Sequence, residues 1–192
     1  MSDNHEYLDD VNKQLLHISE LLEDILVEQQ RTNLAFDNIG EDITFKEEIV
    51  CRELTEVDTS LLTGKNLLIL GFRKQDVKRF VKQISTNATY VPTVENQGDF
   101  GAIVTNCKET DTLLFNCSGI SKAQNILNLI TDTIDDGKLE IKLGKGASAR
   151  TVSLDLPKLN YIFFETTCFL VPRILRDAID CCIWNENDRK KE

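Results

Sequence analysis

A chain of 192 residues with 41% hydrophobic residues can bury one core of ordinary domain size and carry an extension. Its formal net charge of −10 disfavours non-specific attraction to the phosphate backbone, so we expect no direct DNA binding. No apolar run approaches the roughly 18 residues that span a bilayer. The opening residues, MSDNHEYLDD, do not resemble a secretory signal, and we expect a cytoplasmic protein without membrane contact.

The cysteines argue against a metal site. The sequence has six cysteines but no CxxC pair, and only two histidines. A zinc site needs closely spaced ligand pairs. We therefore expect reduced thiols, no metal and no cofactor. The cysteines are Cys51, Cys107, Cys117, Cys168, Cys181 and Cys182.

The first 44 residues carry an apolar heptad that predicts a long amphipathic helix. Its apolar positions recur at steps of three and four residues: Leu8, Val11, Leu15, Ile18, Leu22 and Ile25. A helix of this length must bury its stripe, either on its own domain or against another chain. We expect the second, as a coiled coil that self-associates or as a helix that recruits a protein partner.

The following residues alternate apolar runs with amphipathic stretches, which indicates a doubly wound α/β domain. Strands are expected at 66–70, 89–91, 112–116 and 160–164, and helices at 45–53, 75–84, 100–106, 122–134 and 173–183. A hairpin is expected from 139–143 and 151–156 around a glycine-bearing turn. The chain thus divides into an N-terminal helix (1–44), a core domain (45–184) and a polar tail (185–192).

Three segments of the core domain carry a resemblance to a known family. They read GDFGAIVTN at 98–106, LEIKLGKGASARTVSLDLP at 139–157 and LRD at 175–177. These segments resemble RuvB, the AAA+ ATPase family that drives Holliday-junction branch migration. The resemblance covers roughly residues 64–180. It implies a P-loop NTPase fold like the AAA+ large subdomain, with helices on both faces of a parallel sheet and an inserted β-hairpin.

The family's phosphate loop, GxxxxGK[ST], falls on the strand–glycine–helix unit at 67–84. Its glycines let backbone amides surround phosphates, and its lysine reaches the outer phosphates. Here Asp76 replaces the second glycine and Val77 the lysine. The family's lid and winged-helix domain are not expected within this chain. The remaining candidates of this degenerate nucleotide site are Gly71, Arg73, Lys74 and Lys78.

The family's other nucleotide residues also differ. Its Asp-Glu pair, which holds magnesium and polarises water, corresponds to Asn116 and Cys117. Its polar sensor falls near Thr166, and its intersubunit arginine corresponds to Arg176. With lysine, Asp and Glu all replaced, the residues predict that the chain is not an enzyme.

The hairpin alternates apolar and polar residues. In the resembling family it contacts the partner RuvA, which implies a partner-binding surface here; the alternative is that the hairpin packs on its own domain. The residues of this surface are Leu139, Ile141, Leu143, Arg150 and Val152.

Two main hypotheses for function follow, beside a third in which the chain is a structural coiled-coil protein. The first is a catalytically inactive, RuvB-like scaffold that regulates or binds other proteins in DNA recombination or repair. The second is a divergent ATPase in Holliday-junction processing, with Arg73, Lys74 and Arg176 as nucleotide contacts.

Overall fold

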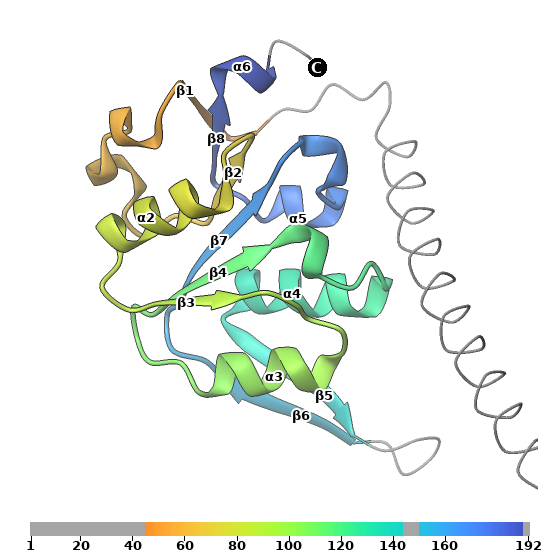
Figure 1. Cartoon of the computed structure of the whole chain (residues 1–192). Helices are drawn as coiled ribbons and strands as arrows, with labels where there is room; N and C mark the ends of the chain where they lie inside the picture. The colour runs from red at the N-terminus through yellow and green to blue at the C-terminus, as the bar shows by residue number, and fades with distance from the viewer. Residues whose placement is uncertain (1–44, 144–149, 190–192) are drawn as a thin grey trace, which may run out of the picture. The chain divides into compact units, whose positions relative to one another are not determined.

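The computed structural model describes residues 45–143 and 150–189 (Figure 1). Six parallel strands form one sheet in the order β1-β8-β2-β7-β4-β3. The predicted N-terminal helix and its heptad lie outside the described residues. The strands are β1 (Glu47–Cys51), β2 (Leu67–Leu70), β3 (Ala88–Val91), β4 (Thr112–Asn116), β7 (Asn160–Glu165) and β8 (Cys181–Asn185).

Helices cover both faces of this sheet (Figure 1). Along β2, successive side chains point to opposite faces, so Leu67 and Ile69 join one core while Leu68 and Leu70 join the other. A strand buried on both faces has no polar alternation, which is why LLIL predicts a central parallel strand. The helices are α2 (Lys74–Ile84), α3 (Gln97–Thr105), α4 (Gln124–Asp136), α5 (Arg173–Asp177) and α6 (Glu186–Arg189), with 3-10 turns η1 (Leu54–Glu56), η2 (Thr59–Leu62), η3 (Cys117–Gly119) and η5 (Cys168–Leu170).

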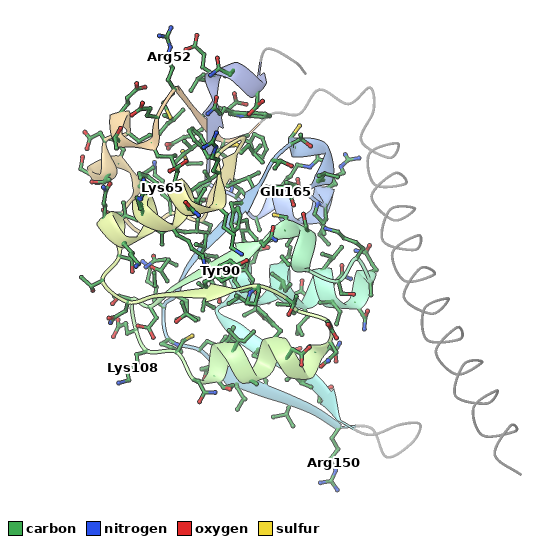
Figure 2. The ribbon with its side chains drawn as sticks, viewed as in Figure 1. Arg52, Lys65, Tyr90, Lys108, Arg150 and Glu165 are labelled. Atoms are coloured by element: carbon green, nitrogen blue, oxygen red, sulfur yellow. The ribbon has the colours of Figure 1, made fainter. Side chains whose placement is uncertain are left out.

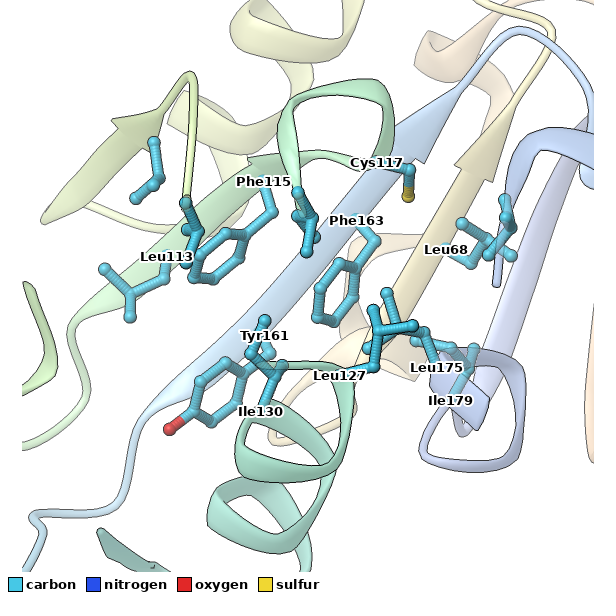
Figure 3. Packing of buried hydrophobic residues seen from close by; sticks show 14 of the residues in the cluster. Leu68, Leu113, Phe115, Cys117, Leu127, Ile130, Tyr161, Phe163, Leu175 and Ile179 are labelled. Atoms are coloured by element: carbon cyan, nitrogen blue, oxygen red, sulfur yellow. The ribbon is translucent and has the colours of Figure 1, made fainter. Parts of the chain in front are cut away.

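The larger core lies between the sheet and the helices α3, α4 and α5. Phe115 of β4 stacks on Phe163 of β7 with ring centroids 5.3 Å apart (Figure 3). Leu127 and Ile130 of α4 cover these rings, and Leu175 of α5 closes the same cluster. The smaller core, on the opposite face, packs α2 with η1 and η2. The predicted α/β fold is confirmed.

Two predicted helices are wrong. The segment expected as a helix over 45–53 contains β1, which pairs with β8 at the sheet edge. The helix expected over 173–183 ends at Asp177, and Cys181–Asn185 forms β8 between β1 and β2. Hydrophobic spacing alone does not separate a buried strand from a helix in a short apolar run. In the segment expected as a polar tail, Glu186–Arg189 forms α6.

The hairpin lies between α4 and β7 in the chain. Its strands β5 (Lys138–Leu143) and β6 (Arg150–Asp155) pair antiparallel in a separate two-stranded sheet. Gly137 ends α4 in the left-handed conformation, with φ 65°, which allows β5 to begin at once.

Candidate functional site at the carboxyl ends of the strands

Three neighbouring strands end together at one edge of the sheet. They are β2, β7 and β4, whose last residues lead into Gly71, Thr166 and η3. The amide of Gly71 donates to the carbonyl of Glu165 at 3.0 Å, which joins the first two ends. In open α/β sheets ligands bind outside the carboxyl ends of the strands, so this edge is the candidate site.

Glu165 lies at the centre of the edge, on β7 between β2 and β4 (Figure 2). Its side chain is buried, with 5% exposure. One carboxylate oxygen accepts a hydrogen bond from the Ser118 hydroxyl. The other accepts from the Thr166 amide at 2.8 Å and from the Thr166 hydroxyl at 3.2 Å. These hydrogen bonds satisfy both oxygens of the buried side chain, as a buried polar group requires.

The turn after β4, η3, also borders the candidate site. Lys122 Nζ donates to the carbonyl of Cys117 at 2.9 Å and so brings a positive charge to this turn. Burial raises the pKa of the Cys117 thiol to about 12, with Glu165 adding to the rise and Lys122 opposing it. Cys117 is therefore protonated at neutral pH and is no nucleophile there. Asn116, at the end of β4, is half-buried.

The residues aligned with the phosphate loop do not gather at one point. Only Gly71, Phe72 and Arg73 separate β2 from α2, and Gly71 has a positive φ of 78°. Val77 is fully buried in the smaller core, so it does not face the edge. Lys74 and Lys78 lie over the Tyr90 ring of β3, with their Nζ atoms 4.4 and 3.7 Å from its centroid. Arg73, which precedes α2, is exposed.

The predicted intersubunit arginine lies on α5. Arg176 of α5 is buried, with 8% exposure, so its side chain would have to move before it reached another subunit. Its intersubunit role stays a prediction.

The residues predicted to form a partner-binding surface on the hairpin differ in exposure between its two strands. Leu139 is fully buried, and Ile141 packs over Gly101 of α3, where an added Cβ would lie 2.9 Å from Ile141 Cδ1. Val152 and Arg150 on the other strand are exposed. The side chain of Leu143 is outside the description. The β5 strand therefore packs on its own domain and β6 is exposed, while partner binding by the hairpin stays a prediction.

Sequence reasoning missed Glu165. The residue follows the apolar run YIFF and ends β7, and a charged residue at the end of a buried strand is the signal that could have found it. The family's sensor position falls one residue later, near Thr166, whose amide and hydroxyl both donate hydrogen bonds to Glu165.

Within residues 45–143 and 150–189 no group of three or more His, Cys, Asp or Glu side chains is placed to hold a metal ion. A helix long and apolar enough to cross a membrane is likewise not found in that part of the chain.

The comparisons with known proteins agree with this topology. The family model of the Holliday junction DNA helicase RuvB P-loop domain matches residues 71–183. RuvB of Campylobacter hominis, a Holliday junction branch migration complex subunit, is 33% identical over 95 residues, which are 49% of this chain and 27% of that protein. RuvB of Campylobacter concisus is 34% identical over 95 residues, 49% of this chain and 28% of that protein. The matched part therefore spans little more than a quarter of these relatives.

A solved structure shows the same fold. A point mutant of Thermotoga maritima RuvB superposes with a TM-score of 0.50 at 16% identity, over 70% of this chain and 48% of that chain.

The match corrects one expectation. The substitutions at the phosphate loop and at Asn116 and Cys117 predicted a chain that is not an enzyme. The matched family, however, is named for a DNA helicase, and its relatives are branch migration subunits. Because the model covers more than half of the chain, from the β2 turn through most of β8, the chain belongs to the RuvB P-loop domain family.

Proposed function

We propose that this chain acts in Holliday-junction processing as a RuvB-family domain that binds a nucleoside triphosphate at the carboxyl edge of its sheet. Two things support the proposal: the family match over 71–183 and the meeting of three strand ends at that edge. The observation that carries it is Glu165, a buried carboxylate at the edge's centre with hydroxyl groups on both oxygens.

Glu165 suits a magnesium ion that arrives with a nucleotide. Mg²⁺ is commonly bound through one or two carboxylates, water and substrate phosphates. One carboxylate with the hydroxyls of Ser118 and Thr166 fits that pattern. The family's Asp would then be replaced in function by a residue on the neighbouring strand.

The phosphates would meet the first turn of α2. Its leading amides have no partners within the helix, and the helix dipole attracts negative charge there. Arg73 is exposed beside these amides and supplies a positive charge. A three-residue turn cannot enclose phosphates as GxxxxGK[ST] does, so we expect weaker binding than that loop gives.

Calorimetry tests the proposal. Mg²⁺-ATP is titrated into the full chain, with and without a four-way DNA junction, and ATP turnover is measured in parallel. We expect saturable binding that Glu165→Gln weakens at least several-fold while binding without magnesium is less affected. The matched control is Glu140→Gln, which removes an exposed carboxylate of the hairpin. Absence of binding to the wild-type chain, or equal affinity in both variants, would refute the proposal.

The second candidate function is docking to another subunit of a branch migration complex, and the hairpin favours it. Residues directly opposite in an antiparallel pair share a face, so Val152 and Leu154 lie on the same face as Ile141 and Leu139. The domain covers the β5 half, whereas Val152 and Leu154 are 37% and 43% exposed. We infer that this uncovered half binds a RuvA-type partner.

A binding assay with purified RuvA from the same organism tests the docking. Leu154→Lys should abolish retention of RuvA, because a buried ammonium opposes an apolar contact. Leu61→Lys, at a 57% exposed leucine of η2, is the matched control and should bind as the wild type does. Equal binding by both variants would contradict this role.

The N-terminal segment is proposed to supply self-association. Its heptad residues, from Leu8 to Ile25, would form the contact between copies. Light scattering of the full chain and of a form lacking residues 1–44 should give different numbers of copies, and identical numbers would remove the proposal.

A further inference from the structure

The short helix α6 lies directly against the Gly71 turn. A Cβ built on Gly71 would lie 2.7 Å from Asp188 Oδ2 and 2.9 Å from Asn185 Cβ. Only a residue without a side chain leaves room for this approach, and the positive φ of Gly71 also favours glycine. The Asp188 carboxylate therefore fills the space beside the turn that follows β2.

Two ion pairs fasten α6 to the β1 side of the sheet. Arg189 Nη2 lies 2.6 Å from Glu48 Oε2, and Arg52 Nε lies 2.7 Å from Glu186 Oε2. The arginines are 47% and 74% exposed, and the two glutamates are less exposed. Exposed pairs of this kind hold weakly and are screened by salt, so these two contacts of α6 are easily broken.

Trp184, two residues before α6, reports on this attachment. It is 5% exposed, packs edge-on against Phe45, and has the Arg189 guanidinium 5.9 Å from its ring. Its Nε1–H is buried and has no hydrogen-bond partner among the described residues. A buried donor without a partner disfavours the closed arrangement, whereas water could satisfy it once α6 moved away.

We propose that α6 is a latch that closes the carboxyl end of β2. While the latch is closed, the Asp188 carboxylate occupies the space beside the Gly71 turn. Its negative charge also repels the phosphate of an incoming ligand. When the Arg189–Glu48 and Arg52–Glu186 pairs break, α6 leaves the Gly71 turn, and this turn becomes accessible to a ligand. The ligand class rests on the proposed nucleotide function, but the movement of α6 does not.

Tryptophan fluorescence tests the movement without any ligand. The sequence contains one tryptophan, so emission reports Trp184 alone. In the double variant Arg52→Ala/Arg189→Ala we expect emission at longer wavelength and stronger quenching by acrylamide. Raising the salt concentration should move the wild-type emission in the same direction. The control is Arg79→Ala, which breaks the exposed Arg79–Asp76 pair of α2. Unchanged emission and quenching in the double variant, with its fold intact by circular dichroism, would overturn the latch.

A second measurement separates the latch from the nucleotide site. Asp188→Asn keeps the size of the side chain and removes its charge, so Mg²⁺-ATP should bind several-fold more tightly than to the wild-type chain. The double variant should show the same gain. If its emission shifts but no variant binds nucleotide, the latch stands and the nucleotide site fails. If nucleotide binds equally to all forms, α6 does not obstruct the turn and the latch is refuted.

Discussion

At the scale of single residues, the larger core depends on ring packing around Phe115. This side chain is fully buried and lies 5.3 Å from Phe163, 6.4 Å from Phe100 and 6.5 Å from Tyr161 between ring centroids. Phe115→Ala should lower the free energy of unfolding by about 3–5 kcal/mol, since a large cavity would remain. Phe115→Leu should cost clearly less. Urea denaturation measures both, and equal losses would show that ring packing is not the cause.

The Cys117 thiol predicts sensitivity to alkali. Its pKa rises from 9.0 to about 12 on folding because burial disfavours the thiolate. Between these values the unfolded chain has lost the proton and the folded chain keeps it, so stability falls as pH increases. The contribution of the protonated Cys117 thiol to the free energy of unfolding is complete below pH 9 and declines above it. Cys117→Ala should reduce the decline in unfolding free energy from pH 9 to 11, and an unchanged decline would place the effect elsewhere.

At the scale of helices and strands, some elements have a clear local sequence signal and others have none. The α3 helix starts at a reciprocal capping box: the Asp99 amide donates to Asn96 Oδ1 at 3.0 Å, and the Asn96 amide donates to Asp99 Oδ2 at 3.3 Å. Asn-x-x-Asp before an apolar run is a local signal, and the helix was predicted. Asn96→Ala should cost about 1 kcal/mol of stability, whereas Asn96→Ser should cost little because serine also caps. Thermal melting compares the two variants.

The strands β1 and β8 carry no such local signal. The run CCIWN, β8, pairs with β1 and β2 on its two edges, and its side chains alternate between the two cores. Parallel neighbours distant in sequence cannot be read from the run itself. The latch has the same origin, because Gly71 and Asp188 meet only through the pairing of β2 with β8.

The hairpin offers a matched test of what its two strands do. Leu139 and Leu154 are directly opposite in the register, yet one is fully buried and the other 43% exposed. Leu139→Ala should cost about 2–5 kcal/mol. Leu154→Ala should stay within about 0.5 kcal/mol, as surface substitutions usually do. Equal losses in chemical denaturation would mean that the domain depends on both strands, and the β6 half would then be no free docking surface.

At the scale of the whole molecule, charge is unevenly distributed along the chain. Residues 1–44 hold eleven of the 32 acidic and two of the 22 basic side chains, which is −9 of the net −10. The remaining residues are almost neutral. The expectation of no direct DNA binding was drawn from the total charge, and it therefore applies to the N-terminal segment more than to the core domain.

The fold could be predicted from apolar runs and from the segments that resemble RuvB, because both depend on local sequence. The candidate site at the carboxyl ends of the strands could not be predicted in this way. Alignment to the phosphate loop placed Val77 at a phosphate, whereas the short turn after Gly71 puts Val77 in the core. The charge of Glu165 after an apolar run is a local signal, but its place at the centre of the edge depends on β7 lying between β2 and β4.

A crystal structure of the full chain with Mg²⁺ and a non-hydrolysable ATP analogue tests the central claim most directly. The Arg52→Ala/Arg189→Ala variant should be crystallised alongside it. We predict phosphates between Gly71 and the first turn of α2, with the metal ion on Glu165 and α6 displaced from the turn. An edge that stays empty in both forms at saturating analogue, or a nucleotide bound away from Glu165, would contradict the account.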